Sequence, residues 1–343
     1  MTVFSIDIEP LNLPMKRTFT ISRGSREHVN NVLIRLHAEG VTGIGEAAPN
    51  HRYSETQQSA MNFLEKTGNY KSENPFDVDE LVRYMEQSEP GEYAAKAGLE
   101  MALYDWIGKK LNLPLYKLLR APARTGPPTT FTLGIDEPDQ MKEKVEEAGP
   151  YPLLKVKLGT DHDKEIITAI REHTSKPLMV DVNEGWKSMD QALDMIRFLH
   201  KQNVYAVEQP LPADCKKEMQ TLRLKSNIPL FADESMAGRE PLQELATQFH
   251  GINIKLMKTG AISTSLQIIH EARKEGLQIM AGCMVESVIA DTASALVALW
   301  ADFADLDGHL LVLNNTFEGL EILPSGHVQV KEIPGLGLSE AVF

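Results

Sequence analysis

Three acidic residues end three successive apolar runs at nearly equal spacing. Asp181 follows LMV, Glu208 follows YAV and Asp233 follows LFA. Lys157 and Lys255 end similar runs on either side of the trio, and neighbours in this set of five lie 22 to 27 residues apart. Carboxylates bind hard divalent cations, and a lysine amine can take up or release a proton. The set therefore predicts a divalent-metal site with proton-transfer chemistry.

This spacing matches one strand, one helix and two short loops, which together take about 20 to 30 residues. Strand-like apolar runs occur at 129–134, 153–158, 178–182, 204–208, 229–232, 252–256, 277–281 and near 302–307. Amphipathic stretches that favour helices lie between them, for example at 161–173, 188–202, 239–248 and 261–275. Such alternation predicts parallel strands closed into an α/β barrel. The charged residues then meet at the carboxyl ends of the strands, where barrel active sites are found.

The first 124 residues have a different pattern and predict a separate α+β capping domain. Strand-like runs suggest a meander over 3–9, 29–37 and 41–45. Apolar residues recur at helical spacing over 92–119, and Pro114 ends or interrupts that helix.

A Pro/Gly-rich stretch, RTGPPTT at 124–130, is the expected linker between the two domains. The barrel domain is predicted to occupy residues 125–319. The segment from about 310 to 343 loses the strand–helix alternation, and its GLGL sequence suggests that the part from about 320 to 343 returns to join the cap.

The candidate metal ligands are all carboxylates. With no His or Cys among them, they favour Mg²⁺ or Mn²⁺ over zinc. A single acid at a strand end often only caps the next helix, but three in succession favour the metal. Lysines inside a barrel are costly unless they are paired or functional. Near a metal and another cation the pKa values of Lys157 and Lys255 would fall, which makes them plausible bases. Lys155 lies two residues before Lys157 and shares its face of the strand.

Over nearly its whole length the chain resembles the muconate-lactonising subgroup of the enolase superfamily. The resemblance rests on KVK at 155–157, DVNEGW at 181–186, EQP at 208–210, ADES at 232–235, NIKLMKTGAI at 253–262, GIGEAAP at 43–49, EMALYDW at 100–106 and PGLGL at 334–338. It implies a modified TIM barrel, (β/α)₇β, closed by the N-terminal cap.

The resemblance also implies roles for individual residues. Lys157 and Lys255 would be two acid/base catalysts on opposite faces of a substrate α-carbon, and Asp181, Glu208 and Asp233 would hold Mg²⁺. A proton would be removed next to a carboxylate to give an enediolate and returned on the other face, which is racemisation or epimerisation. Three further residues would support this site, by steadying the substrate carboxylate (Lys155) or the metal ligands (Asn183 and Glu234).

A DxD pair, Asp305 and Asp307, occurs at the expected end of the eighth strand. In dipeptide epimerases of this subgroup a DxD here binds the substrate ammonium, so the chain resembles that family; the alternative is a surface turn. Arginines of the cap loop, Arg23 and Arg26, suggest an acidic second residue and hence L-Ala-D/L-Glu, as in recycling of cell-wall peptides. Cys283 and Met284 are expected to line the cleft, although packing would also explain them.

Several alternatives remain at this stage. Enzymes of the same architecture include o-succinylbenzoate synthase, N-acylamino acid racemase and muconate cycloisomerase, none of which needs the DxD pair. A Schiff-base lyase would use a lysine but leave the carboxylates without a role. A catalytically inactive barrel that serves as a binding protein would not need lysines in its interior.

Composition narrows the class of protein. The 343 residues carry a net charge of −13, which argues against nucleic-acid binding and against docking to an anionic membrane. No signal peptide, membrane-spanning run or disulfide framework is evident, since the chain has two cysteines, and a cytoplasmic enzyme is expected. A homo-oligomer is compatible with the sequence, which does not determine the oligomeric state.

Overall fold

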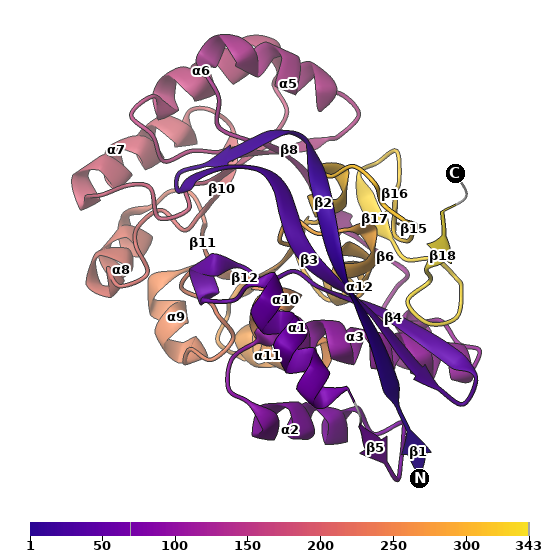
Figure 1. The fold of residues 1–343 in the computed structure, drawn as a ribbon. Helices are drawn as coiled ribbons and strands as arrows, with labels where there is room; N and C mark the ends of the chain where they lie inside the picture. The colour runs from indigo at the N-terminus through magenta and orange to yellow at the C-terminus, as the bar shows by residue number, and fades with distance from the viewer. Residues whose placement is uncertain (69, 342–343) are drawn as a thin grey trace.

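The computed structural model describes residues 1–68 and 70–341, and its larger part is an eight-stranded parallel barrel (Figure 1). The strands are β7 (Thr130–Leu133), β8 (Leu153–Lys157), β9 (Leu178–Asp181), β10 (Val204–Glu208), β11 (Leu230–Ala232), β12 (Gly251–Lys255), β13 (Gln278–Gly282) and β14 (Phe303–Asp305). They pair in sequence order, and a bridge between Thr129 and Ala304 joins the first to the last. The expected barrel is therefore confirmed, with every strand close to its predicted position.

Helices follow the barrel strands on the outside. They are α5 (Met141–Glu147), α6 (Asp163–His173), α7 (Met189–His200), α8 (Lys216–Lys225), α9 (Leu242–Gln248), α10 (Leu256–Thr259), α11 (Ile262–Lys274) and α12 (Val288–Ala298). Most present one buried face to the strands. Helix α12 differs, because all of its residues are buried. Its position against both the barrel and the cap explains why its sequence lacks an amphipathic pattern.

The cap consists of one antiparallel sheet and a set of helices. The sheet contains β2 (Ser5–Ile21), β3 (Gly24–Ala38) and β4 (Val41–Ala47), while β1 (Thr2–Val3) pairs with β5 (Lys71–Ser72). The helices are α1 (Gln57–Thr67), α2 (Val78–Ser88), α3 (Tyr93–Lys110) and α4 (Leu115–Leu118), with Pro114 between the last two. Gly43 and Gly45 let α3 lie directly on β4, since a Cβ there would meet helix carbonyl oxygens at 2.0 and 2.1 Å.

The chain after the barrel runs back to the cap. Strands β16 (Glu321–Ile322) and β17 (His327–Gln329) extend a small sheet with β6 (Thr125–Pro128), and β15 (Phe317–Glu318) pairs with β18 (Ser339–Glu340). Leu115 donates its N–H to Gly335, and Leu336 donates to Asp105 Oδ1 at 2.8 Å. The division into 1–124, 125–319 and 320–343 stays a prediction, and residues 342–343 lie outside the described part.

Hydrogen bonds hold the cap on the barrel mouth. The β2–β3 hairpin extends from the cap over the barrel strands in Figure 1, and Ile135 donates its N–H to Thr20 O at 3.0 Å. From β4, the buried Glu46 accepts the N–H of Ser287 at 2.9 Å at the start of α12. The carboxyl ends of the strands are thus covered by cap segments. Within the described residues, none of the helices is both long and apolar enough to cross a membrane.

Candidate active site

The three strand-end acids meet at the carboxyl end of the barrel. Asp181 ends β9, Glu208 ends β10 and Asp233 directly follows β11, and each offers a carboxylate oxygen within 4.8 Å of the other two. All three side chains are buried. Adjacent parallel strands in register bring these ends together, as the pairing of Asp181 with Glu208 shows.

Four lysines surround the acids. Lys155 Nζ lies 3.0 Å from Asp181 Oδ2, 2.7 Å from Glu208 Oε2 and 2.6 Å from Asp305 Oδ2. The other three each pair with one metal-ligand candidate: Lys157 with Asp181 at 2.5 Å, and Lys255 and Lys258 with Asp233 at 3.0 and 2.7 Å. Ion pairs of this kind offset the cost of burying charge.

The lysines keep two of the acids ionised. Burial acts to raise the pKa of Asp181, but Lys155 and Lys157 outweigh it and lower that pKa below its ordinary value. The pKa of Asp233 is lowered well below 3.8 in the same way, against its burial, chiefly by Lys255 and Lys258. Glu208 is the exception, since burial and the charge of Asp181 raise its pKa to about 7. Three buried carboxylates this close together offer the oxygen ligands that a divalent cation needs.

The carboxylates also act on the lysines. Burial lowers the pKa of Lys255, yet the opposite effect of Asp233 and Glu208 is larger and raises that pKa well above 10.5. This direction is opposite to the lowered pKa that the sequence predicts for Lys255 in a site that holds a metal. Because a divalent ion would neutralise the same carboxylates, its binding would shift the balance back toward that expectation.

Several buried polar atoms around the acids lack hydrogen-bond partners and could bond to the ligands of a metal ion, such as water. Asn183 Oδ1, Glu234 Oε2 and Asn253 Oδ1 are buried and lack a hydrogen-bond partner in the described structure. Asn183 Nδ2 donates to Glu234 Oε1 at 3.2 Å, and Asn253 Nδ2 donates to Glu208 Oε1 at 2.7 Å. Such polar groups usually orient metal ligands and their water. The all-oxygen donor set fits Mg²⁺.

The DxD pair lies in the barrel interior rather than in a surface turn. Asp305 is saturated, since its two oxygens accept from Thr130 Oγ1 and Lys155 Nζ, both at 2.6 Å. Asp307, whose side chain accepts the N–H of Thr132 at 2.5 Å, borders the cleft and pairs with no basic side chain among the described residues. Burial and the charge of Asp305 raise its pKa to about 7. Asp307 is thus the member of the pair whose charge is not balanced by a protein cation.

The cap loops bring three arginines to the cleft, in different states. Arg23, in the turn after β2, donates to Glu234 Oε1 at 2.6 Å and to the carbonyl of Asn183 at 3.1 Å. Arg52, in the short 3₁₀ helix His51–Tyr53, binds Glu184 through two nitrogens. Arg26, on β3, forms no ion pair within residues 1–68 and 70–341, and burial and Arg23 lower its pKa. Of the two arginines predicted to meet the substrate, only Arg26 is free.

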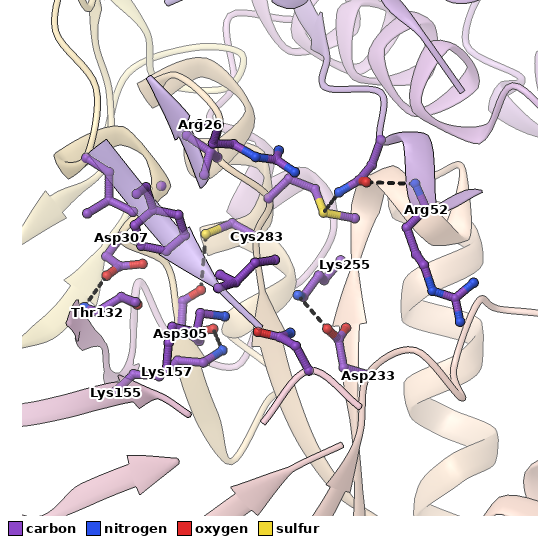
Figure 2. A pocket seen from close by; sticks show the side chains of 18 of the residues that line it. Arg26, Arg52, Thr132, Lys155, Lys157, Asp233, Lys255, Cys283, Asp305 and Asp307 are labelled. Carbon is purple, nitrogen blue, oxygen red and sulfur yellow. Dashed lines mark hydrogen bonds and ion pairs between the residues drawn. The ribbon is translucent and has the colours of Figure 1, made fainter. Parts of the chain in front are cut away.

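One cleft beneath the cap hairpin is lined by the three arginines, the DxD pair, Asp233, Lys155, Lys157 and Lys255 (Figure 2). Cys283 and Met284 border it, and Cys283 Sγ donates to Asp305 O at 3.2 Å. Cap residues Phe19, Ile21 and Tyr53 close the other side. Figure 2 shows Asp305 and Asp307 on one side of the cleft and Lys255 with Asp233 on the other.

Sequence reasoning missed several contributors. Lys258 lies past the expected strand end, so the sequence pattern does not place it in the site. Its position three residues after Lys255 is nevertheless a helical spacing that returns it there. Asn253 precedes Lys255 by two and so faces the same interior. Arg52 and Glu184 carried no signal, since their contact joins segments 132 residues apart.

Comparisons with known proteins agree with this geometry. Residues 5–120 match the family described as mandelate racemase/muconate lactonizing enzyme, N-terminal domain, and residues 136–340 match the enolase C-terminal domain-like family. An L-Ala-D/L-Glu epimerase of Bacteroides thetaiotaomicron is 39% identical over 96% of this chain and 86% of its own length. An N-succinyl-L-Arg/Lys racemase of Bacillus cereus is 30% identical over 98% of this chain and 95% of its own.

A solved structure is similarly close. The dipeptide epimerase of Enterococcus faecalis, in complex with Mg and the dipeptide L-Leu-L-Tyr, superimposes with a TM-score of 0.92. It is 30% identical, and the match covers 99% of this chain and all of the other.

Proposed function

The chain belongs to the mandelate racemase/muconate lactonizing enzyme family of the enolase superfamily, and we propose that it is a Mg²⁺-dependent epimerase of L-Ala-D/L-Glu. Racemases and epimerases are its relatives, so the reaction class is that of an isomerase. The single observation that carries the substrate is the layout of unbalanced charge along the cleft. Among the described residues, no basic side chain pairs with Asp307 and no acidic side chain pairs with Arg26 at the cap side.

The two proposed catalysts stand on opposite walls of the barrel. Lys157 ends β8 and Lys255 ends β12, and three strands lie between them in the eight-stranded order. A substrate α-carbon between these amines would meet one on each face. The neutral lysine would take the α-proton, and the protonated one would deliver a proton to the other face, so the configuration inverts.

Asp181, Glu208 and Asp233 would hold Mg²⁺, with Asn183, Asn253 and Glu234 orienting them. When bound, the ion supplies positive charge that stabilises the dianion formed by proton removal next to a carboxylate. Lys155 would add a fixed ammonium beside the same carboxylate. It is buried between three acids and therefore suited to holding charge rather than to moving a proton.

The charged groups of the substrate can be inferred from the charged residues at the two ends of the cleft. The free ammonium of a dipeptide would pair with Asp307, and the side-chain carboxylate of a second-position glutamate would pair with Arg26. A charge-assisted hydrogen bond contributes about 1.5–3 kcal/mol, enough for discrimination of roughly 10- to 100-fold. Dipeptides released during turnover of cell-wall peptides have this chemistry.

Proton NMR in D₂O tests the proposal. With Mg²⁺ present, the α-proton signal of the second residue of L-Ala-L-Glu should disappear and the diastereomer should appear, and EDTA should abolish both. L-Ala-L-Gln is the matched neutral substrate. Arg26→Gln should lower kcat/KM for L-Ala-L-Glu about 10- to 100-fold and leave L-Ala-L-Gln unchanged.

Two outcomes would redirect the assignment. Equal exchange of the glutamate and glutamine dipeptides would keep a dipeptide epimerase and remove the acidic specificity. Exchange of N-succinyl amino acids but of no dipeptide would instead favour the activity of the Bacillus cereus relative and remove the ammonium role of Asp307.

A further inference from the structure

Both cap loops that cover the cleft contact the same carboxylate of the barrel, that of Glu184. Glu184, in the loop after β9, accepts Arg52 Nε at 3.2 Å on Oε2 and Arg52 Nη2 at 3.1 Å on Oε1. Arg23 Nη1 lies 3.6 Å from Glu184 Oε2. The N–H of Ala213 donates to Oε1 at 2.9 Å. A forked arginine contact of this kind fixes direction as well as distance.

The backbone that presents Glu184 is strained and held from several sides. Asn183 and Glu184 both have left-handed conformations, with φ of 47° and 66°, although neither is glycine. Each such residue costs of order 1–3 kcal/mol and persists only where its surroundings impose it. Here Glu184 donates its N–H to Gln209 O at 2.9 Å, and Gly185 packs so closely on Gly159 that a Cβ would lie 2.4 Å from its Cα.

The same loop carries metal-site residues. Asp181 begins it, and the carbonyl of Asn183 accepts both Ser22 Oγ at 3.0 Å and Arg23 Nη1 at 3.1 Å. Arg23 also binds Glu234, the neighbour of Asp233. Loop 22–26 therefore touches Glu234 beside Asp233, loop 50–54 touches Glu184 on the loop that begins at Asp181, and Glu184 is where the two cap loops share a partner.

We propose that Glu184 is a positioning residue that latches both cap loops, 22–26 and 50–54, onto the metal-ligand loop 181–186, so that closure of the cleft and metal binding reinforce each other. Glu184 and Asp181 lie on one strained loop. A ligand that restrains Asp181 therefore restrains Glu184 as well, and contact of the cap loops with Glu184 restrains Asp181. The latch has a second effect: Glu184 holds Arg52 and, together with Glu234, Arg23, which leaves Arg26 as the arginine available to a substrate.

The test needs no substrate, so it stands even if the proposed epimerisation fails. Amide hydrogen exchange of the full chain is measured with and without Mg²⁺, and Mg²⁺ affinity is measured by calorimetry. In Glu184→Gln, which keeps size and loses charge, exchange in both loops should become about tenfold faster in the presence of Mg²⁺. Mg²⁺ affinity should fall about tenfold, as for other residues that orient metal ligands.

Two further variants separate a shared latch from general loosening. Arg52→Gln should speed exchange in 50–54 alone, and Arg23→Gln should speed it in 22–26 alone. Glu332→Gln, which removes an exposed pair with Lys117, should change neither loop nor Mg²⁺ affinity. Protection unchanged in either loop of Glu184→Gln, unchanged Mg²⁺ affinity, or loosening of both loops by Arg52→Gln would overturn the proposal.

Discussion

Two groups of potential metal ligands occur in the described structure, and they differ in the cations around them. Asp181, Glu208 and Asp233 form the first group, which is interleaved with four lysines. Cys283, Glu286 and Asp291 form the second, and its ligand atoms are just as close together. Within the described residues, His309 is the one basic side chain that pairs with it, at 2.6 Å from Asp291 Oδ2.

The missing lysines change the state of the second group. Burial and the charge of Asp291 raise the pKa of Glu286 well above 4.5. Glu286 Oε2 and Asp291 Oδ1 have no donor among the described residues, which fits a proton held between the two carboxyls. Clustered acids therefore do not by themselves make a metal site. Ionisation, supplied here by lysines in the first group, is what makes carboxylates good ligands.

The largest effects should follow removal of the lysines that flank the first group. Lys157→Ala and Lys255→Ala should each lower the epimerisation rate by about 10²- to 10⁴-fold, because a positioned acid or base contributes that much. Single-turnover NMR in D₂O measures it. Each variant should still exchange the α-proton of one stereoisomer, and wild-type turnover in both variants would exclude the two-lysine mechanism.

Removing one carboxylate from each group should show which group binds Mg²⁺. Asp233→Asn should lower Mg²⁺ affinity more than about 100-fold, since even residues that only orient ligands cost 10- to 100-fold. Calorimetric titration gives affinity and stoichiometry together. The matched control is Asp291→Asn, which should leave one Mg²⁺ per chain and the same affinity; a lost binding site in that variant would make the second group the metal site.

A smaller loss should follow removal of the extra lysine. Lys258 is buried and donates to both the carbonyl and Oδ1 of Asp233, each at 2.7 Å. Lys258→Met keeps the side-chain length and removes these donors, so Mg²⁺ affinity should fall about 10- to 100-fold. Activity should recover at high Mg²⁺ concentration. Lys164→Met, which removes an exposed lysine that pairs with Asp194, is the control. An unchanged affinity in Lys258→Met would show that Asp233 needs no such support.

The smallest effect should be on stability in the second group. A folded-state pKa above 4.5 means that Glu286 contributes stability at acid pH, which is lost as pH rises from about 4.5 through the folded-state pKa. Glu286→Gln mimics the protonated acid and should flatten this decline when the free energy of unfolding is measured by urea at pH 5 to 9. Mg²⁺ affinity should not change. A steeper decline in the variant would mean that Glu286 is ionised in the folded protein.

Much of the barrel could be predicted from the chain because its signals are local. Each strand is a short apolar run, and the charged residue at its end is fixed by sequence position. The set Lys157, Asp181, Glu208, Asp233 and Lys255 needed only the regular strand–helix interval to be placed on one face. Helix α12 shows the limit, because burial on all sides erases the periodicity from which helices are recognised.

By itself, then, the sequence determined the fold class and the strand ends, and it predicted the residues that would bind a metal and move a proton. The tertiary structure decided which charges pair: Arg23 with Glu234, Arg52 with Glu184, Lys258 with Asp233, and Arg26 with none among the described residues. It also distinguished two acidic groups that look alike as lists of residues. The physical reason is that ion pairing and pKa depend on distances of a few ångströms between segments far apart in the chain, and spacing along the sequence does not contain those distances.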